Sequence, residues 1–274
     1  MKKNSPFTTK ESLDTLFRGK LAIIQSKGGY RFSVDAVLLA SFVELRGREK
    51  IGDLGTGNGV IPLLLASLHP SVRVVGVEIQ EPMVKRALRS VNLNRLKDRI
   101  EIVQGDVCSI EKIFSPRSFD SVVCNPPYRG PSSGRVNPDP ERRVARHEIK
   151  GRLRDFLRGG SYLLSHRGRM ALVYPAVRML DLLQTMRQEG VEPKRLRLVH
   201  SFKGAPATLV LAEGIKGGRG GLKIMPPFVV YARRKVYTDE MRSILALNSH
   251  QPAAAGAHLL ESTALGSDKG LDVL

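Results

Sequence analysis

Several residue types that build whole classes of protein site are scarce in this sequence. Among 274 residues there is no tryptophan, aromatic residues make up 5%, and the cysteines are Cys108 and Cys124. Two isolated cysteines without a CxxC pair give no zinc-ligand spacing, so we expect reduced thiols and no bound metal. No apolar run reaches the roughly 18 residues that a membrane-spanning helix needs. The start, MKKNSPFTTK, is basic without a following apolar stretch, which argues against a signal peptide and for a cytoplasmic protein.

Acidic residues are also in deficit. The chain has 26 Asp and Glu against 44 Lys and Arg, which gives a net charge of +18 and a pI near 10.3. Such a surface attracts polyanions, so nucleic acid is the first partner to consider, although a generally basic proteome would give the same excess. Most of the excess lies between residues 129 and 235, with 23 basic and 8 acidic side chains. We expect phosphate contacts from the arginines that begin this stretch, unless they form only a solvated basic loop: Arg129, Arg135, Arg142, Arg143 and Arg146.

Short apolar runs alternate with segments of helical periodicity. This alternation predicts right-handed βαβ units and a mostly parallel, doubly wound α/β sheet. We expect one domain over residues 17–240, a flexible N-terminus over residues 1–16, and a disordered tail over residues 245–274, where Ala, Ser and Gly accumulate. In the helix expected over residues 81–96, the apolar positions predict inward and outward faces. Val84, Leu88 and Val91 would point inward, and Lys85, Arg86 and Arg89 outward.

Polar groups follow the first three expected strands. Asp53 begins the turn DLGTGNG, whose glycines allow a tight bend and a close ligand, and Glu78 follows Gly55 by 23 residues. An acid about 20 residues beyond a glycine turn is placed to accept hydrogen bonds from ribose hydroxyls. After the third strand, Asp106 can accept from an adenine amino group and Val107 offers a backbone N–H. A glycine turn, a solvated glutamate and a helix-capping aspartate are the purely structural alternatives.

The fourth expected strand ends in NPPY, residues 125–128. Two prolines fix the backbone and remove two N–H donors, which leaves the Pro126 carbonyl as an acceptor. The Asn125 side-chain oxygen is a second acceptor, so two oxygens can receive both hydrogens of one amino group. Tyr128 supplies a flat face on which a base can stack. This combination indicates chemistry on an amino nitrogen of a base.

The motifs DLGTGNG, VEIQ, GDV and NPPY, in this order and spacing, resemble class I methyltransferases that act on amino groups. With GYRFSVDAVLL upstream, residues 16–240 resemble the bacterial tRNA(Val) adenine-N6 methyltransferases. The resemblance implies a Rossmann-like, seven-stranded sheet with one antiparallel late strand, S-adenosylmethionine as donor, and an adenine beside the tRNA anticodon as target. It assigns target-base and catalytic roles to Asn125, Pro126, Pro127 and Tyr128. It assigns the cofactor to Tyr30, Phe32, Asp35, Asp53, Gly55, Thr56, Gly57, Asn58, Glu78, Ile79, Asp106, Val107 and Asn125.

Other readings of the same motifs stay open at this point. NPPY loops also occur in methyltransferases of rRNA guanine, DNA adenine and a protein glutamine amide, although a protein substrate does not require so basic a surface. A nicotinamide-dependent oxidoreductase is disfavoured because the turn reads GxGxG and not GxGxxG. A nucleic-acid-binding module without activity is disfavoured because NPPY is intact. The oligomeric state has no signature in the sequence.

Overall fold

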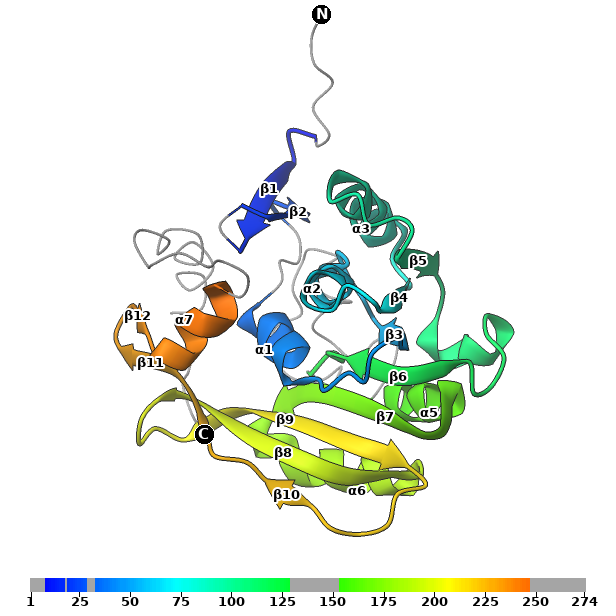
Figure 1. Cartoon of the computed structure of the whole chain (residues 1–274), viewed down its shortest axis with the longest axis vertical. Helices are drawn as coiled ribbons and strands as arrows, with labels where there is room; N and C mark the ends of the chain where they lie inside the picture. Colours follow the sequence, from blue (N-terminus) through cyan, green and yellow to red (C-terminus); the bar gives the residue numbers. More distant parts are fainter. Residues whose placement is uncertain (1–7, 18, 29–32, 129–152, 247–274) are drawn as a thin grey trace, which may run out of the picture.

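The structure is a computed structural model, and it describes residues 8–17, 19–28, 33–128 and 153–246. Within these residues, ten strands form one sheet along the path β12-β11-β8-β9-β7-β6-β3-β4-β5, with β10 paired to β8 (Figure 1). The strands are β3 (Lys50–Leu54), β4 (Arg73–Glu78), β5 (Ile100–Gln104), β6 (Phe119–Cys124), β7 (Leu164–Pro175), β8 (Val191–Phe202), β9 (Ala207–Lys216), β10 (Lys223–Ile224), β11 (Phe228–Arg233) and β12 (Val236–Tyr237).

Seven neighbouring strands, β8-β9-β7-β6-β3-β4-β5, form the expected sheet. All pairs from β7 to β5 are parallel, and β9 is antiparallel to both β7 and β8. The predicted doubly wound α/β fold with an antiparallel late strand is therefore confirmed. The sheet is wider than the expected seven strands because β8, at twelve residues, leaves a long free edge. That edge pairs with β10 and β11.

Helices cover both faces of the sheet. They are α1 (Val34–Phe42), α2 (Val60–Leu68), α3 (Glu81–Leu93), α5 (Leu153–Leu163), α6 (Met179–Gln188) and α7 (Asp239–Ala246), with 3-10 turns η1 (Val107–Lys112) and η3 (Ala176–Arg178). Buried side chains of α1, α2 and α3 form one apolar layer, and those of α5, α6 and η1 form the other. Burial of these two layers against the strands is the main stabilising contribution to the fold. Helix α7 continues to Ala246, past the residue where a tail was expected, and residues 247–274 lie outside the described part.

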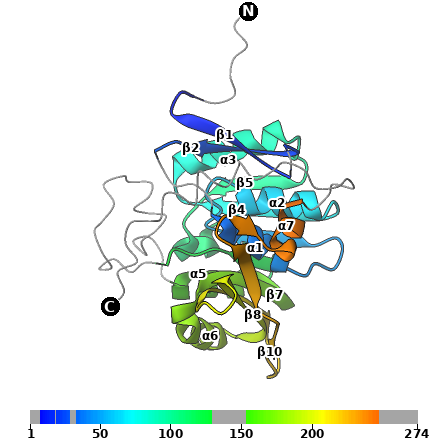
Figure 2. The ribbon, with the colours of Figure 1, turned by 90° about the vertical axis from the view of Figure 1, so that its left-hand side faces the viewer.

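The N-terminal segment forms a hairpin of β1 (Glu11–Leu16) and β2 (Leu21–Ser26), where a flexible N-terminus was expected. Polar side chains of α3 satisfy the backbone of β2: Ser90 Oγ accepts from Ile24 N at 3.0 Å, and Asn94 Oδ1 accepts from Ala22 N at 2.9 Å. The hairpin lies at the opposite end of the molecule from α6 and β10 (Figure 2). β1 falls within the segment expected to be flexible, and composition does not reveal it because β1 is held by pairing with β2, which is itself bound to a helix about 70 residues away.

Helix α3 presents a different face to the core from the one that residue type predicted. Arg86 is buried at 7% exposure, while Leu88 is exposed at 42%. The buried face repeats at positions 83, 86, 87, 90 and 91, which is a regular helical spacing of three and four residues. The predicted inward position of Leu88 and outward position of Arg86 were therefore wrong. Arg86 points inward because it has a polar partner there, the side chain of Asn58.

Candidate active site

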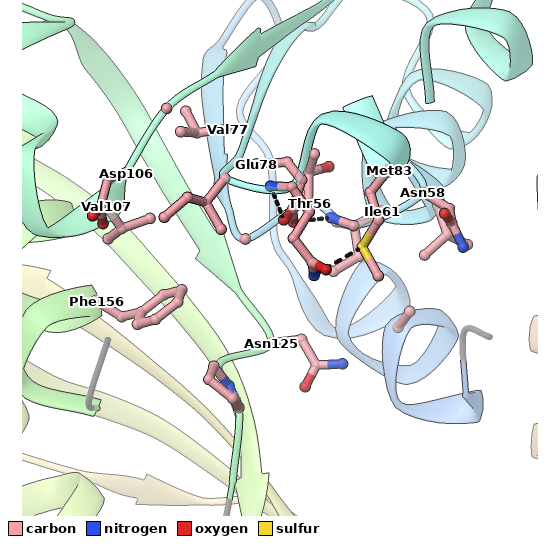
Figure 3. A pocket seen from close by; sticks show the side chains of 18 residues that line it. Thr56, Asn58, Ile61, Val77, Glu78, Met83, Asp106, Val107, Asn125 and Phe156 are labelled. Atoms are coloured by element: carbon pink, nitrogen blue, oxygen red, sulfur yellow. Dashed lines mark hydrogen bonds between the residues drawn. The ribbon is translucent and has the colours of Figure 1, made fainter. Parts of the chain in front are cut away.

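A crevice opens at the carboxyl edge of β3, β4, β5 and β6, where the βα loops of an open α/β sheet meet. It is open to solvent on one side and is lined by residues of all four of these strand ends, and by Ala36 and Phe156. Figure 3 shows Asp106, Val107 and Phe156 on one side, Thr56, Glu78 and Met83 on the other, and Asn125 at the lower edge. The lining residues are Ala36, Gly55, Thr56, Gly57, Asn58, Val60, Ile61, Val77, Glu78, Ile79, Gln80, Met83, Gly105, Asp106, Val107, Asn125, Pro127 and Phe156.

The glycine turn forms the floor of this crevice between β3 and α2. Gly57 has a φ of +58°, and a Cβ there would have only Met83 Sδ near it, at 4.0 Å, so the backbone faces open space. A Cβ on Gly55 would lie 3.1 Å from the Phe156 ring. Glycine at these positions therefore lets the turn bend, brings an aromatic ring against it and leaves its backbone open to a ligand.

Glu78 ends β4 and is held in place by backbone donors. Its Oε2 accepts from Gly57 N and its Oε1 accepts from Gln80 N, both at 2.9 Å. The residue is 5% exposed but still lines the crevice. A carboxylate oxygen has more than one acceptor direction, so these bonds fix the group without using its full capacity for ligand hydroxyls.

Asp53 lies fully buried behind the glycine turn and does not line the crevice. Neither of its carboxylate oxygens, nor the hydroxyl of the buried Thr56, makes a hydrogen bond of normal geometry within the described residues. Burial raises the pKa of Asp53 to about 7; the neighbouring Thr56 hydroxyl acts to lower this pKa, and the charge of Glu78 acts to raise it.

The loop after β5 brings Asp106 and Val107 to the crevice. Asp106 Oδ1 accepts from Cys108 N at 2.9 Å, so the side chain also caps η1. Phe156 of α5 lies on the same side of the crevice as this loop and is 5% exposed (Figure 3). Asp106 thus has both the structural role and the ligand-facing position considered for it, and Phe156 adds an apolar wall that had no sequence signature beyond helical periodicity.

Arg86 of α3 holds the end of the glycine turn. Its Nε donates to Asn58 Oδ1 at 3.1 Å, and Asn58 itself is 3% exposed. Asn58 was expected to contact the cofactor directly. In the structure it lines the crevice while its side-chain oxygen is bound to Arg86. Arg86 therefore fixes the turn from behind, a role that a charged residue in a surface helix did not indicate.

The NPPY loop brings Asn125 and Pro127 to the crevice. Pro126 is buried, and no donor to its carbonyl is found within the described residues. The Tyr128 hydroxyl donates to Asp35 Oδ2 at 2.7 Å and also contacts Asn125 Oδ1. Asp35, expected beside the cofactor, instead contacts Tyr128 and is not among the residues that line the crevice.

Two residues that the sequence did not single out fix Tyr128. Arg178 Nη1 donates to the Tyr128 carbonyl at 2.9 Å, and its guanidinium lies 5.1 Å from the centre of the Tyr174 ring. The Tyr128 and Tyr174 rings meet edge to face, with centroids 5.9 Å apart. The end of β7 and the turn η3 thus set the orientation of the NPPY loop.

The structure brings most of the predicted cofactor residues together around one crevice. Those that line it are Gly55, Thr56, Gly57, Asn58, Glu78, Ile79, Asp106, Val107 and Asn125. Tyr30, Phe32 and the five arginines Arg129, Arg135, Arg142, Arg143 and Arg146 lie outside the described residues. Within the part of the chain that is described, no group of three His, Cys, Asp or Glu is arranged around a metal position, and no helix is long and apolar enough to cross a membrane.

Comparison with known proteins identifies this arrangement. The family model of the methyltransferase small domain matches residues 31–188, more than half of the chain. The chain belongs to the methyltransferase small domain family. A tRNA1(Val) (adenine(37)-N6)-methyltransferase of Porphyromonas gingivalis is 36% identical over 70% of this chain and 76% of the relative. One of Tolumonas auensis is 29% identical over 69% of this chain and 78% of the relative.

A solved structure agrees with the fold of this methyltransferase. A predicted O-methyltransferase from Agrobacterium tumefaciens superposes with a TM-score of 0.63, covering 77% of this chain and 94% of its own at 23% identity. At that identity the likeness concerns the fold alone. The predicted class I methyltransferase fold and the predicted family resemblance are confirmed.

The methyltransferase family uses S-adenosylmethionine, and the crevice of this member fits it. The donor carries a sulfonium and an ammonium group, and the crevice places Glu78 and Asp106 at two strand ends, with Asp53 behind the turn between them. The acidic side chains suit the positive charges of the donor, and the apolar wall at Phe156 suits its nucleoside. The predicted cofactor is therefore consistent with the residues of the crevice.

Proposed function

We propose that this methyltransferase transfers a methyl group from S-adenosylmethionine to the N6 amino group of an adenine in tRNA, beside the anticodon. The observation that carries the proposal is the position of Asn125 at the edge of the crevice, in a loop whose neighbouring Pro126 carbonyl has no donor within the described residues. The names of the relatives support a tRNA adenine as the target. Such a substrate also predicts a cytoplasmic enzyme.

Catalysis by these residues rests on positioning and electrostatics. The donor supplies an electrophilic methyl carbon attached to its sulfonium. The lone pair of an adenine amino nitrogen is delocalised into the ring, which makes the nitrogen a poor nucleophile. When Asn125 and the Pro126 carbonyl accept its two hydrogens, the nitrogen becomes more tetrahedral and its lone pair becomes available. Glu78 and Asp106 would hold the donor in the crevice. The amino nitrogen gains the methyl group as the donor's carbon–sulfur bond breaks, and the nitrogen then releases one of its two protons.

Tyr128 couples target binding to the state of Asn125. In the structure the side-chain oxygen of Asn125 contacts the Tyr128 hydroxyl. The target amino group requires this same Asn125 oxygen as its acceptor. Asp35 offers the hydroxyl a second acceptor at 2.7 Å. When the target enters, the hydroxyl keeps a partner by donating to Asp35 alone, so freeing Asn125 leaves no buried donor unpaired.

An assay with tritiated donor tests the proposal. Purified enzyme is incubated with tRNA, rRNA, DNA and protein fractions, and the labelled nucleoside is identified by mass. We expect label in tRNA as N6-methyladenosine. Label in a glutamine amide, in guanine or in DNA would replace the tRNA assignment, and no label in any fraction would refute a methyltransferase with these substrates.

An Asn125→Ala variant tests the site within the same assay. The proposed interaction strengthens in the transition state, so single-turnover methylation should fall by at least about a hundredfold. Affinity for the donor should stay within a few fold, because Asn125 only borders the donor side of the crevice. A variant that methylates at the full rate would show that NPPY is only a turn.

A further inference from the structure

Three aromatic rings gather at the end of β8 and β11, away from the crevice. The Phe202 and Tyr231 ring centroids are 5.6 Å apart with planes tilted by 33°, and Tyr231 stacks on Tyr237 at 5.0 Å and 17°. Phe202 is 40% exposed, and the two tyrosines are half-buried. The group therefore presents an aromatic ring to solvent on a stack that is already ordered.

Four basic residues lie next to these rings along the chain, one directly after Phe202 and three between Tyr231 and Tyr237: Lys203, Arg233, Arg234 and Lys235. All four are exposed, and none has an ion-pair partner within the described residues. Nearby Arg197 and Arg242, in contrast, pair with Glu240 and Asp239. We call the three rings with these four cations the aromatic–basic patch.

Strand directions put the patch on the same edge of the sheet as the catalytic loop. β8 and β11 run parallel to β6 and β7, so Phe202 and Arg233 end at the carboxyl edge. Pairing places Cys124 level with Leu196 through β7 and β9, and β8 continues six residues further to Phe202. Figure 1 shows β11 and β12, in orange, at the side of the molecule bordered by α7.

The separation between the patch and the catalytic loop can be estimated from sheet geometry. Four strand spacings, from β6 through β7, β9 and β8 to β11, span roughly 20 Å across the sheet at about 4.8 Å each, and the six residues by which β8 continues past the level of Cys124 add up to roughly 20 Å along the strands. Stacked nucleotides advance about 3.4 Å, so the separation corresponds to at least about six nucleotides along one strand. A single target nucleotide cannot reach both places, but a folded RNA can.

We propose that the aromatic–basic patch is a second RNA-binding site that holds unpaired nucleotides of the substrate outside the catalytic crevice. A base stacks on the exposed Phe202 ring, and the four cations contact the neighbouring phosphates. Exposed aromatic rings among unpaired cations are the arrangement that binds single-stranded nucleic acid, since every base has a face for stacking. An acidic peptide would use the cations and leave the ordered rings without a role. The inference rests on the proposed RNA substrate.

Matched variants test the patch. Arg233→Ala/Arg234→Ala removes two of its charges, and Arg219→Ala/Lys223→Ala removes two exposed charges near β10, away from it. Affinity for tRNA is measured between 50 and 200 mM salt with the full chain and without donor. The patch variant should lower the slope of log affinity against log salt by about 1.4, because a single strand loses about 0.7 per phosphate contact. The control should change it by less than half of that.

Phe202→Ala tests stacking separately. It should weaken tRNA binding about five- to a hundredfold with little change in the salt slope, and Phe202→Tyr should restore binding. Melting temperatures near those of the parent verify folding. The proposal would be overturned if Arg233→Ala/Arg234→Ala left the salt slope unchanged and Phe202→Ala left the affinity for tRNA unchanged. Binding of polyglutamate, a model acidic peptide, is measured in parallel. Variants that lose polyglutamate binding but keep tRNA binding would also overturn the proposal. If the parent binds tRNA through the patch but methylates none, the proposed function fails while this site stands.

Discussion

The hydroxyl of Tyr128 lies 2.7 Å from Oδ2 of Asp35, a residue 93 positions earlier in the chain. The same hydroxyl contacts Asn125, yet it has a single hydrogen to donate. Asp35 stands in the first turn of α1, and Tyr128 stands in the NPPY loop. The contact therefore ties α1 to the loop for which we propose binding of the target base, and in that proposal Asp35 is a positioning residue.

The first prediction concerns this contact. Asp35→Ala should lower kcat about tenfold, the effect of one lost hydrogen bond of about 1.4 kcal/mol, with little change in donor affinity. Asp35→Asn retains an acceptor and should restore most of the rate. Combined with Tyr128→Phe, Asp35→Ala should cause no further loss, because both changes remove the same bond. If the rate losses of the two single variants add in the double variant in single-turnover assays, the two residues act independently and the prediction is wrong.

The second prediction concerns the donor. Glu78→Ala should weaken S-adenosylmethionine binding by about 1.5–3 kcal/mol, because it removes a charged acceptor and also releases Gly57 and Gln80. Glu81→Ala is the matched control, since Glu81 lies three residues away and forms only an exposed pair with Lys85. Calorimetry that finds equal affinities for the two variants would remove Glu78 from the donor site.

The third prediction follows from the pKa of Asp53. Its folded value of about 7 lies above the 3.8 of an ordinary aspartate, so the folded chain without donor binds more protons between these values. Stability should therefore fall as pH rises from about 4 to 7. Asp53→Asn should abolish this dependence and raise the melting temperature at pH 8 by at least about 2 °C, the shift for about 1 kcal/mol. If the parent and the variant differ in melting temperature by the same amount at pH 5 and at pH 8, the raised pKa of Asp53 is contradicted.

The fourth prediction concerns the hairpin. Arg89 donates to both carboxylate oxygens of Glu11 and holds the pKa of Glu11 at about 2, below its usual 4.5. Its stabilisation is thus present above about pH 4.5 and is lost as pH falls toward 2. Glu11→Gln should destabilise the hairpin by about 1.5–3 kcal/mol at pH 7 and by little near pH 2. Hydrogen exchange of residues 21–26 measures this, with the exposed Glu101→Gln as control; equal exchange in parent and variant at pH 7 would refute it.

The order of strands and helices and the position of the crevice were predictable from the sequence, because buried parallel strands leave continuous apolar runs and their carboxyl ends must meet. Gly57, Glu78, Asp106 and Asn125 follow such runs directly. Each is placed by the end of its own strand, and so local sequence sufficed to bring them to one edge.

The contacts that fix these groups were not predictable. Arg86 reaches Asn58, Arg178 reaches the Tyr128 carbonyl, and the Tyr128 hydroxyl reaches Asp35. Each joins segments between 28 and 93 residues apart through side chains whose type alone indicates a solvated surface. The hairpin was missed for the same reason, since polar groups of α3 satisfy its backbone.

The docking of β2 on α3 bears on how this chain can be shortened. Leu21, Ile23 and Ile24 of β2 are buried at 0–2% exposure. Helix α3, on which β2 docks, carries Arg86, which binds Asn58 at the end of the glycine turn. Removing residues 8–26 would uncover apolar surface and strip Ser90 and Asn94 of their partners on the same helix. A version of the enzyme trimmed to the span of the family match, from residue 31, would therefore be prone to aggregate and would bind its donor poorly even though every residue of the crevice remained.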